Sequence, residues 1–528
     1  MLAVVSSHAP IGMEGELVSV EVDIRRGLPG IDVVGLPDGA VRESKERVRV
    51  AIRNSGFSFP PDRILISLAP AGVRKEGASF DLPIALGILA ASGQILPEGV
   101  GHAMVLGELN LGGGVRPVHG VLSAVGTGLA AGLSTFLVPR ENLREARALG
   151  KGTVAGISSL REAALALSHP CASLRSSQDE SPEDPLAVGG YGQTPSAAGW
   201  FDGGDLSDIR GHSQLKRALE VAAAGRHHVL LFGPPGSGKT MAARRLPSLL
   251  PELDREEALA VTRIHSIAGV LPADAGLVHR PPFRMPHHSA SSEGIIGGGR
   301  LLKPGEASLA HHGVLFLDEA PEFGMRLLQG LREPIEDGWI SIARAGSTVR
   351  YPASLQLVLA FNPCPCGNLG RAGQVCICSL NEVHRYWRRV GGALLDRIDL
   401  RVPLSPVSAT DMCARPAPEE GMKARDRVSR AVSRQRLRYA GLAFSWNARI
   451  PVGSIDRFCG LDSRGRAALL RAAESFGISS RAFHSILRTA RTIADLAGEE
   501  RIEETHVREA VQYRRYGDGD FFWTKGRV

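Results

Sequence analysis

The segment GPPGSGKT, residues 233–240, restricts the fold of this chain more than any other feature. It follows the apolar run HHVLLF and precedes the helix-forming run MAARRLPSLL. A glycine-rich loop between a strand and a helix turns its backbone N–H groups toward an anion at the helix N-terminus. The sequence therefore predicts a parallel α/β sheet that carries a phosphate-binding loop. A chance glycine-rich turn is the alternative, and the strand-loop-helix context disfavours it.

A second strand end completes the predicted nucleotide site. Lys239 is expected to hold the β- and γ-phosphates, and Thr240 to ligate Mg²⁺. The run GVLFLDE ends in Asp318, which fits the organisation of Mg²⁺, and Glu319, which fits the base that activates water. The residues expected to bind ATP are Gly233, Pro234, Pro235, Gly236, Ser237, Gly238, Lys239, Thr240 and Asp318. Together these motifs predict ATP hydrolysis with Mg²⁺.

Three polar residues outside these motifs are further candidate catalytic groups. Asn362 ends the run LQLVLAFN, where its side chain could bridge the γ-phosphate and the attacking water. An Asn before a proline is also a common turn residue, which is the alternative. Arg397 and Arg481 are candidates for the cations that neutralise charge during phosphoryl transfer. If Arg397 acts on a neighbour's nucleotide, the enzyme must form a ring.

Composition and periodicity divide the chain into folded and linking segments. Runs of alternating strand and helix character predict two α/β regions, and the C-terminal region is helical by period. Segments rich in Ser, Pro, Gly, Ala and acid predict linkers. The expected segments are an N-terminal domain at 1–168, a flexible linker at 169–200, an ATPase core at 201–406, a linker at 407–419, a helical lid at 420–515 and a tail at 516–528.

Charge and hydropathy indicate the cell compartment and permit one class of partner. The formal net charge of +7 allows nucleic acid as a partner, although solvated helix faces explain the basic runs equally well. The N-terminal residues lack the basic start and long apolar core of a signal peptide. No run offers the roughly 20 uninterrupted apolar residues of a membrane span. We therefore expect a cytoplasmic protein without a membrane partner.

Four of the seven cysteines form one cluster in the sequence CPCGNLGRAGQVCIC. Cys364, Cys366, Cys376 and Cys378 stand as two C-x-C pairs, and four thiolates at close spacing suit tetrahedral Zn²⁺. The spacing is tighter than the usual C-x₂-C, and reduced or redox-active thiols are the alternative. Two adjacent histidine pairs, at 287–288 and 311–312, are not expected to be ligands, because neighbouring side chains tend to point apart.

Several motifs together resemble one known family. They are the phosphate loop, GVLFLDEAPEF, PHHSAS, IIGGGRLLKPGEASLAHHG, NPCPCG and LLDRIDL. Over nearly its whole length the chain resembles the magnesium-chelatase-like AAA+ ATPases of the ComM (YifB) type. The resemblance implies sensor 1 for Asn362, a trans-acting finger for Arg397 and sensor 2 for Arg481. It also implies a homo-hexameric motor that moves branch points of DNA, with single-stranded or branched DNA and recombination proteins as partners.

The same resemblance suggests where DNA would be held. In helicase relatives a β-hairpin before sensor 1 projects into the channel of the ring, and ISIARAG here looks like that hairpin, with Arg344 near its tip. The helix-2 insert at 283–312 would line the same channel, with Arg300 and Lys303 as further candidate contacts. Such cations could hold phosphates. A solvated turn arginine is the alternative for Arg344.

The N-terminal domain resembles the α/β catalytic fold of Lon protease, of the ribosomal S5 type. KEGASFD matches the segment of the Lon nucleophile and places Ser79 there. The position of the Lon lysine is Ala124, so no neighbouring base is evident, and Lys75 is a possible substitute. We therefore expect a DNA-binding or ring-stabilising module rather than a protease.

Two other functions compete with the DNA motor. A chelatase motor would use the same AAA+ core to drive metal insertion into a tetrapyrrole, but no integrin-like companion domain is visible in the sequence. A regulatory scaffold would use nucleotide only as a switch, and the intact pair Asp318 and Glu319 counts against it.

Overall fold

The computed structural model describes residues 2–96, 101–168, 204–300, 302–344, 347–371, 373–413, 418–514 and 516. The predicted linker at 169–200 and all of the predicted tail except Tyr516 lie outside the described residues. The chain forms two compact units. Unit 1 contains the described residues within 1–197, 254–279 and 345–350, and unit 2 contains the others.

Unit 1 is built on a seven-stranded mixed sheet in the order β3-β4-β2-β1-β5-β8-β9. The pairs β1–β2 and β2–β4 are antiparallel, and the other neighbours are parallel. β6 and β7 form a separate antiparallel pair. The strands of unit 1 are β1 (Leu2–Ala9), β2 (Glu16–Arg25), β3 (Gly30–Val34), β4 (Arg63–Ala69), β5 (Ala103–Val105), β6 (Glu108–Leu109), β7 (Val115–Arg116), β8 (Thr135–Pro139) and β9 (Thr153–Ile157).

One helix of unit 1 is apolar on every side because it is enclosed on every side. All residues of α2 are buried, and α2 contacts β1, β2, α1 and α6. Gly87 permits this packing, since a Cβ there would lie 2.6 Å from Val22 Cγ2. The helices of unit 1 are α1 (Gly39–Asn54), η1 (Ala78–Phe80), α2 (Asp81–Ala91), α4 (Val121–Ala130), η2 (Arg140–Asn142), α5 (Leu143–Arg147), α6 (Leu160–Ser168) and α10 (Arg255–Ala268).

Helix α10 belongs to unit 1, although it follows the phosphate loop in the sequence. Ser266 joins it to the N-terminal elements by two buried hydrogen bonds. Its hydroxyl donates to Glu145 Oε1 at 2.5 Å and accepts from the N–H of Gly120 at 2.8 Å. Burial raises the pKa of Glu145, and the Ser266 hydroxyl opposes that shift. The domain boundaries drawn from the sequence remain predictions, because compact units and folding domains need not coincide.

Unit 2 is built on a five-stranded sheet in the order β11-β14-β17-β10-β18, in which every neighbouring pair is parallel. Strands buried on both faces read as continuous apolar runs, and VLLF and VLFL are such runs. The strands here are β10 (Val229–Phe232), β11 (Phe283–Arg284), β12 (Gly297–Gly298), β13 (Lys303–Pro304), β14 (Val314–Leu317), β15 (Trp339–Arg344), β17 (Gln356–Phe361) and β18 (Leu400–Pro403). β15 pairs with β16 (Ser347–Pro352) in a two-stranded sheet.

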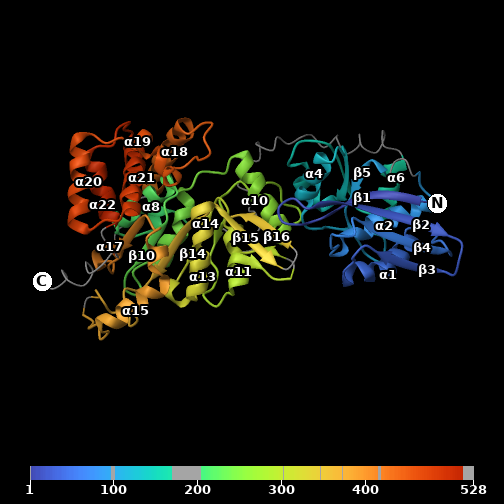
Figure 1. Ribbon diagram of the computed structural model, residues 1–528, viewed down its shortest axis with the longest axis horizontal. Coiled ribbons are helices and arrows are strands. Elements are labelled where there is room, and N and C mark those ends of the chain that lie inside the picture. Colours follow the sequence, from blue (N-terminus) through green and yellow to red (C-terminus); the bar gives the residue numbers. More distant parts are fainter. Residues whose placement is uncertain are drawn as a thin grey trace. The chain divides into compact units, whose positions relative to one another are not determined.

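Helices surround this sheet, and the C-terminal ones gather in a helical region, drawn in orange and red in Figure 1. α18 and α21 pack against α8. His227 helps to hold this region, with its Nε2 2.8 Å from Thr492 Oγ1 and its Nδ1 3.1 Å from Asp399 Oδ2. The helices are η3 (Leu206–Asp208), α8 (Ser213–Gly225), α9 (Lys239–Arg245), η4 (Leu246–Leu249), α11 (Ser292–Ile296), α12 (Glu306–Leu309), η5 (Ala320–Glu322), α13 (Met325–Gly330), α14 (Arg332–Asp337), α15 (Leu380–Val390), α16 (Gly392–Leu395), α17 (Ala409–Cys413), α18 (Pro418–Arg438), η6 (Asn447–Arg449), η7 (Val452–Ser454), α19 (Ile455–Phe458), α20 (Ser463–Phe476), α21 (Ser480–Ala497) and α22 (Glu504–Arg514).

The predicted fold class is confirmed in its main features: mixed α/β, a parallel sheet with a phosphate loop, and a helical C-terminal region. The likeness of residues 1–168 to Lon protease stays a prediction. Within the predicted linker at 407–419, residues Ala409–Cys413 form α17. None of the helices in the described part of the chain has the length and hydropathy that a membrane span requires.

Candidate active site

Three neighbouring strands bring the predicted nucleotide-binding groups to one edge of the sheet. β17 lies between β10 and β14, and all three run parallel. β10 leads into the phosphate loop, β14 leads to Asp318, and β17 leads to Asn362. Ligands of open parallel sheets bind outside the carboxyl ends of the strands. The topology therefore places these residues where a nucleotide would bind.

The phosphate loop owes its shape to two glycines in the left-handed region. Gly236 has a φ of 77° and Gly238 a φ of 84°, values that side-chain-bearing residues rarely adopt. α9 begins directly after them, at Lys239. The local sequence GSGK thus turns the chain sharply from β10 into a helix whose first N–H groups face the loop.

Lys239 and Ser237 supply hydrogen-bond donors to this loop. Lys239 Nζ donates to the carbonyls of Gly233 at 2.7 Å and Pro234 at 3.0 Å, and to Asn362 Oδ1 at 3.1 Å. Burial lowers the pKa of Lys239, and the charges of the two neighbouring carboxylates partly offset this effect. Ser237 Oγ is buried and lacks a partner among the described residues. A buried hydroxyl without a partner among the described residues, and an ammonium that bonds two loop carbonyls and the Asn362 amide oxygen, fit the binding of phosphate oxygens.

The predicted magnesium ligands contact each other. Thr240 Oγ1 donates to Asp318 Oδ2 at 2.6 Å, so the hydroxyl of α9 meets the carboxylate at the end of β14. Mg²⁺ prefers oxygen ligands and usually takes only one or two protein groups along with phosphate oxygens and water. This pair fits such a site for Mg²⁺ bound with a nucleotide.

Glu319 adopts a strained backbone and points toward solvent. Its φ is 53°, and its side chain is 59% exposed. Non-glycine residues in this region are uncommon and cluster at active sites. His288 Nδ1 lies 3.5 Å from Glu319 Oε2, so an imidazole of the helix-2 insert stands beside the predicted base. Sequence reasoning missed this contact, since nothing in PHHSAS indicates its distance from GVLFLDE.

The histidine pairs do not point apart as expected. The rings of His287 and His288 lie 4.1 Å apart, and those of His311 and His312 lie 4.0 Å apart. The premise that adjacent side chains diverge holds for extended strands and fails in these irregular segments.

The two candidate arginines meet at one carboxylate. Arg397 Nη2 pairs with Glu336 Oε1, and Arg481 Nη2 lies 2.8 Å from the same oxygen. Arg481 lies in the first turn of α21, whose start is capped by the hydroxyl of Ser479. In the described part of the chain, no hydrogen bond or ion pair joins either arginine to the phosphate loop. The structure therefore brings these two cations together at one carboxylate.

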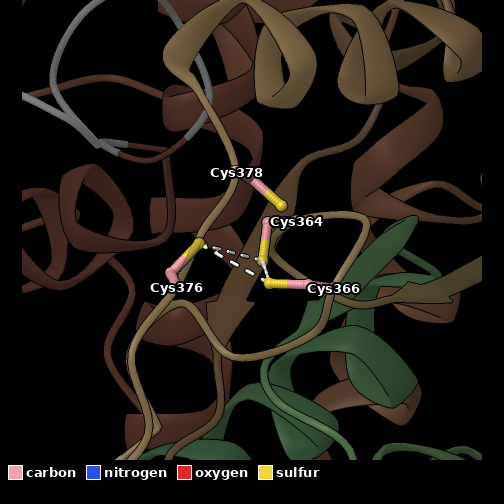
Figure 2. Close-up of side chains that lie close together, drawn as sticks. All are labelled: Cys364, Cys366, Cys376 and Cys378. Atoms are coloured by element: carbon pink, nitrogen blue, oxygen red, sulfur yellow. Dashed lines mark hydrogen bonds between the residues drawn. The ribbon is translucent and has the colours of Figure 1, made fainter.

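The four predicted zinc ligands converge (Figure 2). Cys364 Sγ lies 3.4 Å from Cys366 Sγ and 3.6 Å from Cys376 Sγ, and Cys366 Sγ lies 3.7 Å from Cys376 Sγ. Cys378 supplies the fourth sulfur, and the four sulfurs lie within 4.8 Å of one another. The edge of a tetrahedron with Zn–S bonds of about 2.3 Å is about 3.8 Å. The cluster therefore fits one tetrahedral ion.

The protonation of the cluster is uneven. The backbone N–H of Asn368 lowers the pKa of Cys366 to about 6, whereas burial raises the pKa of Cys364, Cys376 and Cys378. A metal must displace the protons of the other thiols, and its binding is therefore expected to weaken in acid. The cluster also adjoins the nucleotide loop, because a Cβ at Gly367 would lie 2.9 Å from Pro235 Cγ.

The candidate DNA contacts lie on two neighbouring hairpins. Arg344 is exposed at the end of β15. Arg300 and Lys303 are exposed on the smaller hairpin of β12 and β13. The hydroxyl of Tyr351, on β16, donates to the carbonyl of Leu302 at 2.9 Å and ties the two hairpins together. Their role in binding DNA stays a prediction.

The Lon-like positions do not form an evident catalytic dyad. Lys75 is buried, burial lowers its pKa, and its Nζ donates to the carbonyl of Pro70. Ser79 lies in η1, and Ala124 is buried in α4. The positions of Lys75, Ser79 and Ala124 give no support to proteolysis.

Comparisons with known proteins agree with this site. The family described as magnesium chelatase, subunit ChlI, matches residues 205–412. Two related descriptions, subunit ChlI of Mg-chelatase and its C-terminal part, match residues 20–142 and 418–514.

Whole proteins of several bacteria are also similar. A Mycobacterium tuberculosis protein is 41% identical over 97% of this chain and 98% of its own length. YifB of Escherichia coli is 40% identical, and competence protein ComM of Haemophilus influenzae 39%, each over 97% of both chains. The magnesium-chelatase 38 kDa subunit of Rhodobacter capsulatus is 29% identical over 30% of this chain and 50% of its own length.

Proposed function

This chain belongs to the magnesium-chelatase-like AAA+ ATPases of the ComM and YifB type, and from that premise we propose that it is a hexameric, ATP-driven motor that moves branched DNA. The ATPase activity follows from the family. The DNA motor rests chiefly on one observation, the exposed Arg344 at the end of a hairpin strand in an ATPase unit. The name of one relative that matches 97% of both chains, competence protein ComM, supports a role in handling DNA.

The residues that hydrolyse ATP in this proposal follow the ends of β10, β14 and β17. The loop N–H groups, Ser237 and Lys239 hold the phosphates of ATP. Thr240 and Asp318 would hold Mg²⁺, which would supply positive charge to neutralise the phosphates. Glu319 orients water and accepts its proton, and Asn362, already within 3.1 Å of Lys239, orients the same water.

A ring supplies the cations that one chain lacks at its own loop. Arg397 and Arg481 contact Glu336 instead of the phosphate loop of the same chain. A subunit placed beside them would present its γ-phosphate to both guanidinium groups. An arginine supplied in this way is worth about 10³ to 10⁵ in kcat. Homo-hexamerisation therefore belongs to the proposed mechanism.

A motor that moves DNA must bind the DNA backbone as well as hydrolyse ATP. Arg344, Arg300 and Lys303 are exposed on tethered hairpins, and phosphate contacts from such cations do not depend on base sequence. A motor for branched DNA needs this kind of grip, since it must act on any sequence.

The four cysteines are proposed to hold structural Zn²⁺. Their sulfur distances suit a closed tetrahedral site, with no position left for water. The ion would fix the loop that packs on Pro235 and thereby support the nucleotide site.

A chelatase motor is the second candidate, since the matching family descriptions name magnesium chelatase. The ComM and YifB relatives match 97% of this chain, whereas the Rhodobacter capsulatus subunit matches 30%. Coverage therefore favours the DNA motor. A nucleotide-switched scaffold is disfavoured by the pair Asp318 and Glu319.

The test is the ATPase rate of the purified chain with no DNA, single-stranded DNA, duplex and a four-way junction. We expect DNA to raise the rate, and Arg344→Ala to reduce that stimulation while the rate without DNA persists. An ATPase that ignores all three DNAs would contradict the DNA motor, and stimulation by a tetrapyrrole chelatase partner would favour the second candidate.

A further inference from the structure

Glu336 is the meeting point of three arginines from three separate segments. It lies near the end of α14. Its Oε1 accepts from Arg397 Nη2 and from Arg481 Nη2, the latter at 2.8 Å. Its backbone carbonyl accepts from Arg449 Nη1 at 3.1 Å. No sequence motif marks this glutamate, which stands in PIEDGWI between the ATPase strands.

Arg449 holds the backbone of Glu336 in place. Arg449 Nη1 also donates to the carbonyl of Ile335 at 2.6 Å, so one guanidinium holds two successive carbonyls of α14. Arg449 ends η6, at the edge of the helical C-terminal region. These bonds hold the backbone from which the Glu336 side chain extends, and the two arginines hold its carboxylate.

Charge explains why a carboxylate is needed there. Two guanidinium groups that share one oxygen would repel each other without a negative charge between them. This repulsion would be strongest at Arg397, because only 8% of its side chain is exposed and its Nε has no partner among the described residues. Its remaining hydrogen bond goes to the carbonyl of Ala393. Glu336 lowers the charge of the Arg397 and Arg481 pair from two to one, and Asp396 Oδ2, 3.9 Å from Arg481 Nη1, offsets part of the rest.

We propose that Glu336 is a positioning residue that holds Arg397 and Arg481 as a pair for the γ-phosphate of the neighbouring subunit. The proposal rests on the ring of the proposed function. Glu336 does not touch the nucleotide and acts only through the two arginines. Its substitution therefore harms the site that a subunit completes next door, and not the site in which that subunit binds its own ATP.

Mixed rings separate these two sites. Arg397→Ala subunits keep their phosphate loop and lack the finger, and Lys239→Ala subunits keep the finger and lack a working loop. Their mixture should hydrolyse ATP at the interfaces where an intact phosphate loop of one subunit meets an intact Arg397 of the next. Glu336→Gln is then added to one partner at a time. Asp337→Asn, the neighbouring exposed carboxylate on the same helix, is the matched control.

The expected result depends on which partner carries Glu336→Gln. In the Lys239→Ala subunit, which supplies the arginines, it should lower the recovered kcat about tenfold, as for the loss of one charged hydrogen-bond partner, with little change in KM for ATP. In the Arg397→Ala subunit it should change the rate less than about twofold, since that subunit supplies no finger. Asp337→Asn should have no effect in either place.

Each other result overturns the proposal. Equal losses from both placements would mean that Glu336 serves folding or assembly alone, and no loss from either would mean that it positions nothing. If the starting mixture recovers no ATP hydrolysis although light scattering verifies rings, then neighbouring subunits do not share an active site. That last outcome is distinct, since it appears before Glu336 is changed.

Discussion

Replacing Cys366 by Ser should break the four-cysteine cluster and release its metal. The sulfurs of Cys364 and Cys378 close a loop of about 15 residues, and a cross-link around a loop of that length contributes about 3 kcal/mol through the entropy of the unfolded chain. For a unit of this size, a loss of about 3 kcal/mol lowers the unfolding temperature by about 5–10 °C. Because Gly367 packs on Pro235, KM for ATP should rise as well.

The assay combines metal analysis with thermal unfolding. Protein purified without chelators should contain about one Zn per chain, and Cys366→Ser should contain little. A strong zinc chelator should lower the unfolding temperature of the parent protein and leave that of Cys366→Ser unchanged. Cys413→Ser is the matched control, because Cys413 is exposed and lies outside the cluster. A parent protein that contains no zinc, or whose unfolding temperature the chelator leaves unchanged, would refute the reasoning.

Three further predictions concern the base, the hairpin and the buried network of unit 2. Glu319→Gln should retain ATP binding, measured with a fluorescent analogue, and lose turnover by at least about 100-fold, since it keeps the shape and removes the base; turnover within a few fold of the parent would exclude Glu319 as that base. Arg344→Ala should flatten the slope of log K for duplex DNA against log salt by about 0.9 for each phosphate that the arginine neutralises, and an unchanged slope would leave Arg344 a solvated residue. Burial raises the pKa of Asp399, but the hydrogen bond from His227 and the two imidazoles outweigh it and hold that pKa well below its ordinary value. The stabilisation by Asp399 is therefore present above about pH 4 and fades as the pH falls further. Asp399→Asn should lower the free energy of unfolding at pH 7 by about 1–3 kcal/mol in urea titrations and should reduce its loss in acid, and an unchanged pH profile would contradict this.

The sequence predicted those parts of the fold that local chemistry determines. GSGK requires a tight left-handed turn, and the apolar runs before the loop and before Asp318 require strands buried on both faces. Parallel strands then bring Lys239, Asp318 and Asn362 to one edge of the sheet, because their carboxyl ends meet there. The convergence of the cysteines likewise follows from their spacing, since all four fall within the 15 residues of CPCGNLGRAGQVCIC.

Contacts between distant segments were not predictable in this way. His288 beside Glu319, and Glu336 beside two arginines, depend on how loops pack, and no period or spacing in the sequence records that packing. The placement of α10 in unit 1 has the same origin. Asp254 and Glu257 cap this helix locally, but the partner of its buried Ser266 is Glu145, more than a hundred residues away.

A four-way junction tests most directly the proposal that this ATPase moves branch points of DNA. The junction carries mobile homologous arms with a fluorophore on one strand, so that branch migration yields two duplexes, one of which is labelled. We expect the parent protein to separate the junction into duplexes with ATP and not with a nonhydrolysable analogue. Glu319→Gln and Arg344→Ala should both fail, the first without ATP hydrolysis and the second with it. A parent protein that hydrolyses ATP in the presence of the junction and leaves the junction unchanged would contradict the proposed DNA motor.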